Sequence, residues 1–183
     1  MKFTAAKQHV KNRGVVPDDF LDQLVAFGKE APDEIFAANS FSDVYSSVVN
    51  TLGPWQDIKH RRAVMLEVMR VLAGFESSWN WNEGRDTTNV TSVTPDTIEA
   101  GAWQVSANSM NFGHELKDLV LANVGTLDGN AFQKAMKQNH PLAMEYIARL
   151  LRRTTAANGP VVRHEIDPWL RQDAVAEFQS LIG

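Results

Sequence analysis

The pattern of hydrophobic and polar positions is strongest between residues 57 and 75. After a polar start, residues 63–75 carry Val, Met, Leu, Ala and Phe on almost every side of a predicted helix. A helix that is apolar nearly all round must be surrounded by other elements. The pattern therefore predicts a central, buried helix, and this helix delivers Glu76 at its end, directly before a Ser-Ser-Trp run.

Other segments combine a narrower apolar stripe with the residues that begin and end helices. Pro17 is followed by two acidic residues, which the positive end of a helix dipole favours. Gly125 follows an apolar periodic segment, as is common after the last turn of a helix. Ser40 or Ser42 is a candidate cap for a further helix. The predicted helices cover about residues 17–29, 32–38, 41–52, 109–124, 128–138, 141–155 and 167–181.

Two segments lack a helical pattern. Residues 77–100 contain Asn, Gly and Pro, which favour turns, together with Thr and Val, which favour extended structure. We expect a small β-hairpin or an irregular β-lobe there, forming one wall of a cleft. Residues 1–16 are polar and predict a short helix or an arm. The fold class predicted is α+β and mostly α-helical, with one domain over residues 1–183.

Length and composition agree with this organisation. The chain has 183 residues, enough for a sizeable core in one domain. Its hydrophobic fraction of 44% and charged fraction of 22% are ordinary for a soluble globular protein. The formal net charge of −4 gives no support for nucleic-acid binding by charge. It also means that attraction to an anionic cell wall would depend on a cleft or a local basic patch.

Several chemistries are disfavoured by what the sequence lacks. There is no cysteine, which excludes disulfides and thiol catalysis. The five histidines are scattered without metal-ligand spacing, and no phosphate-cradling glycine-rich loop occurs. We therefore expect neither a metal nor a cofactor. No run of eighteen apolar residues occurs, so no membrane span is expected, and the first ten residues lack the apolar core of a signal peptide.

Glu76 is the strongest candidate for chemistry. Apolar neighbours disfavour its ionised form, and the negative end of the helix dipole acts in the same direction. A carboxyl group that stays protonated near neutral pH is what a general acid requires. The simpler alternative is a solvated glutamate at a helix end, because most glutamates are exposed.

Aromatic residues near Glu76 favour a sugar-binding interpretation. Trp79, Trp81 and Trp103 are three of the five tryptophans and lie close to Glu76 in the sequence. Aromatic faces stack on the apolar faces of sugar rings, and a tryptophan-lined cleft beside an acid is typical of glycosidases. Core packing is the alternative for each of these tryptophans.

At these residues the chain resembles a known family. Glu76 is followed by Ser-Ser-Trp and, after a loop, by Gly101-Ala-Trp103-Gln104-Val-Ser106. This arrangement is similar to the lysozyme-like superfamily, nearest the goose-type lysozymes and the soluble lytic transglycosylases. In that family a Glu-Ser pair at a helix end is followed by Gly-Leu-Met-Gln and then Val or Ile. Ala102 and Trp103 replace the family's Leu-Met, and its Tyr-Asn-Ala-Gly motif has only a distant echo around Asn158.

The resemblance implies a lysozyme-like domain in which Glu76 protonates the glycosidic oxygen. It also implies that Gly101 and Gln104 shape the floor of the cleft. Gln104 and Ser106 offer hydrogen-bonding groups for N-acetyl sugars, although Ser106 is equally suited to cap a helix. A loop after a late helix faces the sugar site in this fold, which makes Asn158 a further binding candidate.

A second carboxylate would decide the chemistry. An inverting hydrolase needs a base that activates water, a retaining one needs a nucleophile, and a lytic transglycosylase needs neither. The segment 77–100 holds Glu83, Asp86, Asp96 and Glu99. Asp86, in Gly-Arg-Asp, looks similar to the loop acid of goose-type lysozymes and is our first candidate, with Asp96 second. For each, a turn residue bonded to its own backbone is the alternative.

We therefore predict a muramidase that cleaves the β-1,4 bond between N-acetylmuramic acid and N-acetylglucosamine. The alternatives are a lytic transglycosylase, a chitinase or chitosanase of the same fold, and a non-catalytic glycan-binding protein. We expect a monomer acting on peptidoglycan in the periplasm or outside the cell, as an endolysin or a secreted effector. An immunity or inhibitor protein is a further candidate partner. Without a signal peptide, delivery would need a phage-made pore, a secretion machine or a signal absent from this sequence.

Overall fold

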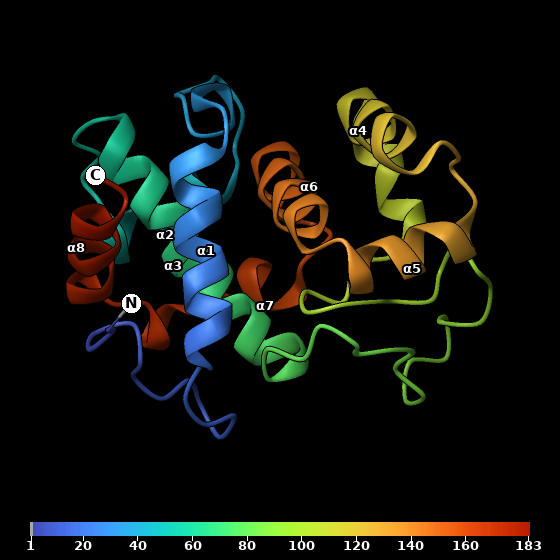
Figure 1. Ribbon diagram of the computed structural model, residues 1–183, viewed down its shortest axis with the longest axis horizontal. Coiled ribbons are helices and arrows are strands. Elements are labelled where there is room, and N and C mark those ends of the chain that lie inside the picture. The colour runs from blue at the N-terminus through green and yellow to red at the C-terminus, as the bar shows by residue number, and fades with distance from the viewer. Residues whose placement is uncertain (1) are drawn as a thin grey trace.

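A computed structural model describes residues 2–183 and is mostly α-helical (Figure 1). Three short 3₁₀ helices connect the α-helices. The α-helices are α1 (Asp18–Glu30), α2 (Val44–Leu52), α3 (Ile58–Ser77), α4 (His114–Val124), α5 (Gly129–Gln138), α6 (His140–Arg153), α7 (Gly159–Val162) and α8 (Gln172–Leu181). The 3₁₀ helices are η1 (Asp33–Ile35), η2 (Ala107–Phe112) and η3 (Asp167–Trp169).

Helix α3 lies at the centre of the fold, which confirms the buried central helix predicted from its sequence. Every residue from Ala63 to Phe75 is buried. Helices α1, α6, α7 and α8 all pack against α3. In Figure 1, α1 and α8 lie on one side of α6, and α4 and α5 lie on the other. The buried side chains form one hydrophobic cluster that runs through both parts.

Polar side chains define where several helices begin. Asp57 accepts a hydrogen bond from the backbone N–H of His60 and caps α3, and Asp128 caps α5 in the same way. Helix α2 is capped by Asp43, not by Ser40 or Ser42, and the Asp43 carboxylate also pairs with Arg152 of α6. The aspartate is favoured here because it satisfies the helix end and a buried guanidinium at once.

Two predicted helices are interrupted. The segment predicted as one helix over 109–124 is η2 followed by α4, with extended backbone at Gly113 between them. The last predicted helix begins as η3 and restarts as α8 after Leu170 and Arg171. The backbone N–H of Arg171 donates to the carboxylate of Glu67 instead of continuing a helix, so a tertiary contact overrides the local pattern.

The expected β-hairpin is not formed. Within residues 2–183 the only bridge between extended segments is the isolated pair Ala100 and Val105. Residues 80–99 instead form a loop in which side chains bond to nearby backbone groups: Asn80 accepts from the N–H of Asn82, and Asn89 accepts from that of Thr91. Such local bonds compete with a strand ladder for the same backbone donors.

The segment expected to be an arm is packed onto the body. Phe3, Ala6 and Val10 are buried in the core. The carboxylate of Glu177 in α8 accepts hydrogen bonds from the backbone N–H groups of Thr4 and Ala6, each at 2.7 Å. No helix forms between residues 2 and 16, but turns there carry the chain across the end of α3.

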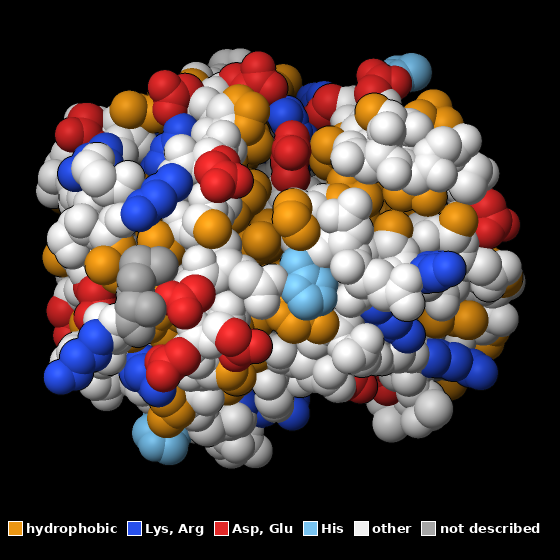
Figure 2. Space-filling view, viewed as in Figure 1, with side chains coloured by type: hydrophobic (Ala, Val, Ile, Leu, Met, Phe, Trp, Pro, Cys, Tyr) orange, Lys and Arg blue, Asp and Glu red, His pale blue; other side chains and the backbone are white. Residues whose placement is uncertain are grey.

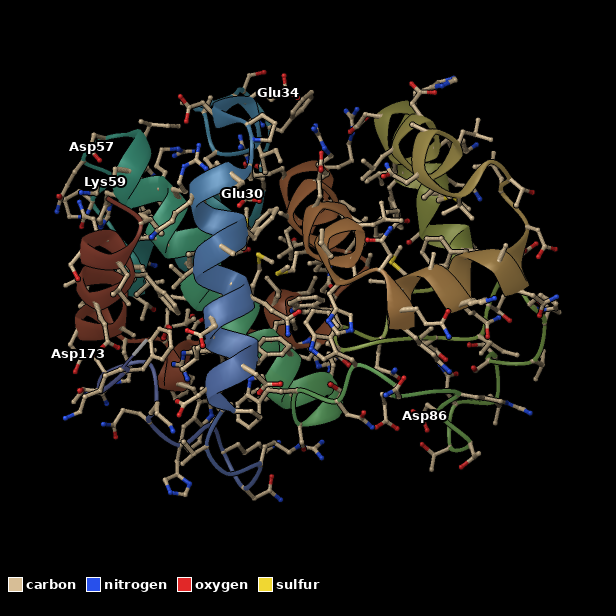
Figure 3. All side chains as sticks on the ribbon, in the orientation of Figure 1. Glu30, Glu34, Asp57, Lys59, Asp86 and Asp173 are labelled. Carbon is tan, nitrogen blue, oxygen red and sulfur yellow. The ribbon has the colours of Figure 1, made fainter. Side chains whose placement is uncertain are left out.

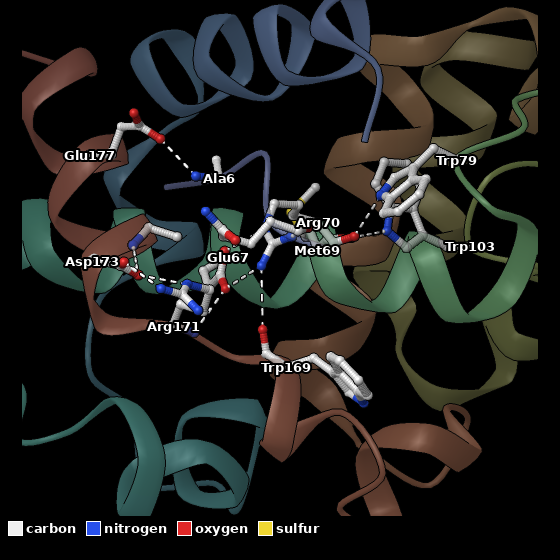
Figure 4. A network of polar contacts seen from close by, with 12 residues as sticks. Ala6, Glu67, Met69, Arg70, Trp79, Trp103, Trp169, Arg171, Asp173 and Glu177 are labelled. Atoms are coloured by element: carbon white, nitrogen blue, oxygen red, sulfur yellow. Dashed lines mark hydrogen bonds and ion pairs between the residues drawn. The ribbon is translucent and has the colours of Figure 1, made fainter. Parts of the chain in front are cut away.

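A buried polar network runs along α3 (Figure 4). Glu67 and Arg70 are fully buried, and their side chains are joined by two hydrogen bonds of 2.7 Å. Arg70 also donates to the backbone carbonyl of Trp169, and Trp79 donates its ring N–H to the carbonyl of Arg70. The network links the C-terminal segment to Trp79, which follows the end of α3.

The surface is mixed in charge. Figure 2 shows acidic and basic side chains interspersed over the face that it presents. Among the helices of residues 2–183, none is long and apolar enough to cross a membrane.

Candidate active site

Glu76 is fixed by the way α3 ends. Ser78 adopts a left-handed conformation and closes the helix, and the backbone N–H groups of Ser78 and Trp79 bond back to the last turn. The hydroxyl of Ser77 donates to the carbonyl of Ala102 at 2.8 Å. The end of α3 is therefore tied directly to the Gly101–Ser106 turn.

Glu76 opens into a cavity of about 610 Å³. Its walls come from four separate parts of the chain: the N-terminal segment, the end of α3 with the following loop, the Gly101–Ser106 turn, and the start of α7 with the residues before it. Most of the lining side chains are polar. The lining residues are Arg13, Glu76, Glu83, Arg85, Asp86, Thr87, Asn89, Glu99, Gln104, Ser106, Ala157, Gly159 and Pro160.

The electrostatics of Glu76 suit a proton donor. Burial raises the pKa of its carboxyl group to about 7. The guanidinium groups of Arg163 and Arg13 lower this pKa, and the carboxylates of Glu99 and Glu165 raise it. Within residues 2–183 the Glu76 carboxyl makes no hydrogen bond and no ion pair, so it is available to a ligand.

The Gly101–Ser106 turn has a geometry that only certain residues allow. Gly101 has a φ of 77°, and a Cβ there would lie 2.7 Å from the carbonyl oxygen of Met136. Its backbone N–H donates to the carbonyl of Glu83 at 2.9 Å, which draws the loop against the turn. Gln104 lines the cavity, and its side-chain amide donates to the Gly101 carbonyl. Gly101 itself shapes the turn and does not line the cavity.

The chain has no match among protein-family models, curated proteins or solved structures. The sequence resemblance therefore rests on residues 75–106 alone. Within residues 2–183, no three His, Asp or Glu side chains are grouped so that they could hold a metal ion.

The two aspartates proposed from the sequence differ in position. Asp86 lines the cavity, but it is exposed on the long loop that Figure 3 shows below α5. Its carboxylate accepts hydrogen bonds from the hydroxyl and the backbone N–H of Thr88, and these bonds lower the pKa of Asp86. This is the geometry of a turn residue. Asp96 does not line the cavity and lies against Gly129 at the start of α5.

Glu99 has a more firmly oriented carboxylate in the cavity than Asp86. It lines the cavity and accepts hydrogen bonds from the amide of Asn89, at 2.7 Å, and from the hydroxyl of the fully buried Ser92. Two donors fix the orientation of its carboxylate, and it is close enough to Glu76 to raise that residue's pKa. The sequence placed Glu99 among four candidates, but nothing in the pattern distinguished it.

The predicted tryptophan platform is not found. Trp79 and Trp103 are buried, and their ring N–H groups donate to the backbone carbonyls of Arg70 and Met69 in α3 (Figure 4). Trp81 is half-buried and stacks on His140, with ring centroids 3.8 Å apart. None of the three rings lines the cavity. All three pack in or against the hydrophobic core, where Trp81 and Trp103 contact Phe20 of α1.

Two further sequence candidates lie at the edge of the site. Ser106 lines the cavity, and its hydroxyl donates to the side-chain oxygen of Asn108 at 2.6 Å. Asn158 is buried behind the cavity wall, although its neighbours Ala157 and Gly159 form part of that wall.

No sequence pattern predicted the two cationic side chains in the cavity. Arg13 comes from the N-terminal segment and Arg85 from the long loop. Within residues 2–183, each of the other arginines bonds to a carboxylate or a backbone carbonyl, but these two make no such contact. Only the tertiary packing of residues 2–16 brings Arg13 to Glu76.

Proposed function

We propose that the protein is a glycosidase that cleaves the β-1,4 bond of peptidoglycan, with Glu76 as the general acid. The observation that carries this proposal is a carboxyl group with a pKa raised to about 7, fixed at the end of a buried helix and facing a polar cavity. A carboxylic acid with a pKa near 7 is protonated in about half of the molecules at neutral pH and can donate its proton to a leaving oxygen. The resemblance of the two motifs to lysozyme-like proteins supports the same chemistry and the same fold.

In this proposal Glu76 protonates the glycosidic oxygen, and Glu99 orients and deprotonates the attacking water. Glu99 suits the second role because Asn89 and Ser92 hold its carboxylate in place. Gln104 and Ser106 supply hydrogen-bonding groups along the floor of the cavity. Hydrolysis is favoured over transglycosylation because a fixed carboxylate is present beside the acid.

Peptidoglycan is favoured over chitin by the two arginines of the cavity. Arg13 and Arg85 are free to pair with a carboxylate of the substrate. Peptidoglycan carries such groups on its stem peptides, whereas chitin has none. A protein with this activity acts on the cell wall, in the periplasm or outside the cell.

The pH dependence of cleavage tests the role of Glu76. Because the acid must be protonated, kcat/KM is expected to fall above pH 7, which is about the pKa of Glu76. Arg163 lowers this pKa, so Arg163→Gln should move the fall in activity to higher pH. Initial rates on peptidoglycan between pH 4 and pH 9 would measure both effects. A profile that stays flat through pH 7 in both proteins would contradict the assignment.

The reaction products and the second carboxylate can be tested together. Mass spectrometry of digested peptidoglycan is expected to show muropeptides with reducing ends. Glu99→Gln should lower the rate of hydrolysis by about 10²-fold or more, because it removes the base. Asp86→Asn is the matched control on the same loop and should leave most of the activity, because its carboxylate serves a turn.

Other product patterns would redirect the proposal. Anhydro-sugar ends that persist in Glu99→Gln would identify a lytic transglycosylase. Intact peptidoglycan with cleaved chitin or chitosan oligomers would identify an enzyme of another substrate class. If all three polymers stay intact under the wild-type protein, the glycan-binding alternative replaces catalysis.

A further inference from the structure

The cavity at Glu76 continues as a groove along η2. A neighbouring hollow of about 160 Å³ shares Gln104, Ser106 and Ala157 with it. A third hollow, of about 280 Å³, shares Asn108 and Phe112 with the second. Because neighbouring hollows share lining residues, the three form a row of adjacent hollows that leads from Glu76 to the far end of η2.

The far end of this groove carries an exposed aromatic ring between two amides. The side chain of Phe112 is 44% exposed, while Ala107, Ser109 and Met110 of the same 3₁₀ helix are buried. Asn108 and Asn111 are exposed beside it and complete the lining of the last hollow. An apolar ring face flanked by amide donors and acceptors matches a sugar ring, which has apolar C–H faces and polar edges.

The ring is held in place by the helix that bears it. The hydroxyls of Ser109 and Tyr146 share a buried hydrogen bond of 2.6 Å, which fastens η2 to α6. The hydroxyl of Ser109 also lies 2.7 Å from the carbonyl of Ser106. The backbone N–H of Asn108 donates to the carbonyl of Asp96 at 2.9 Å. A platform fixed from two sides loses little conformational entropy when a ligand binds.

We propose that Phe112, Asn108 and Asn111 form a saccharide-binding subsite remote from Glu76. A glycan chain bound there extends through the groove to the cavity, so the protein binds several sugar units at once. We favour a glycan as the ligand because the row of hollows connects the subsite to the cavity at Glu76. The inference rests on the proposed function for its choice of ligand, but it concerns binding and not turnover.

Binding should be measured in the Glu76→Gln background, where cleavage does not interfere. The probes are a defined octasaccharide and a disaccharide of alternating N-acetylglucosamine and N-acetylmuramic acid, titrated by calorimetry. Phe112→Ala is expected to weaken the affinity for the octasaccharide by about 3- to 10-fold and to leave the affinity for the disaccharide unchanged. The matched control is Phe41→Ala, because Phe41 is 54% exposed but lines a different hollow.

The outcomes separate this inference from the proposed chemistry. Length-dependent loss of binding in Phe112→Ala supports the subsite even if the wild-type protein cleaves no glycan, in which case only the chemistry fails. Three outcomes would contradict the subsite. They are an unchanged affinity for the octasaccharide, an equal loss of affinity for both probes, and no binding of either probe by the parent protein. Thermal melting of Phe112→Ala checks that η2 remains folded, and Asn111→Ala repeats the test without removing the ring.

Discussion

Replacing Glu76 with glutamine is expected to lower peptidoglycan cleavage by about 10²- to 10⁴-fold while the protein stays folded. Glutamine has the shape of the acid but cannot donate a proton to a leaving oxygen. Rates measured by release of soluble muropeptides would show the loss. Glu83→Gln is the control, because Glu83 lines the same cavity and its carboxylate accepts a hydrogen bond from Asn80.

The same variant should be more stable than the wild type at neutral pH. The folded-state pKa of Glu76, about 7, lies above its ordinary value of 4.5. Folding therefore favours the protonated form of Glu76. The contribution of this group to the unfolding free energy is fully present below pH 4.5 and is lost as the pH rises through 7. Above that range the glutamine variant should gain up to about 3 kcal/mol of unfolding free energy. Denaturant titrations at pH 4 and pH 8 measure the difference; equal stabilities at pH 8 would show that Glu76 is solvated.

The second large effect is expected at the buried pair of Glu67 and Arg70. Arg70→Met removes the cation and leaves the Glu67 carboxylate uncompensated in the core, which should cost about 3–5 kcal/mol of unfolding free energy. This is a large share of the stability of an ordinary domain. Urea denaturation followed by circular dichroism would measure it.

Two further variants distinguish the effect of breaking this buried ion pair from the effect of removing any charged side chain. Glu67→Leu combined with Arg70→Met replaces both charges with apolar groups and should recover most of the loss. Asp173→Asn breaks the exposed pair with Arg171 and should cost less than about 1 kcal/mol. A loss below that level in Arg70→Met would mean that water reaches Glu67.

The sequence predicted the helices well where an apolar stripe and a cap agree. Residues 63–75 are apolar on nearly every side, and they form the buried part of α3. The prediction failed where a distant contact decides the backbone, as at Arg171, or where side chains compete for backbone donors, as at Asn80 and Asn89. These contacts cannot be read from local periodicity.

The candidate site was predictable only in part. Glu76, Gln104 and Ser106 were placed in one cavity because they belong to motifs on either side of one loop. The roles of Trp79 and Trp103 could not be predicted, because the local sequence does not distinguish a tryptophan buried in the core from an exposed one that stacks on a sugar. Arg13 lies 63 positions before Glu76 in the numbering, and no local pattern connects the two.

The cavity also has a consequence for the order in which the protein can mature on the ribosome. Arg13 is made well before α8, yet Glu177 of α8 fastens the segment that carries Arg13. Another wall comes from Ala157, Gly159 and Pro160. A nascent chain can form α1 and α3 much earlier, but it cannot close the cavity until α8 has left the exit tunnel. The pocket at Glu76 is thus completed only after the whole stretch from Arg13 to Glu177 has been made.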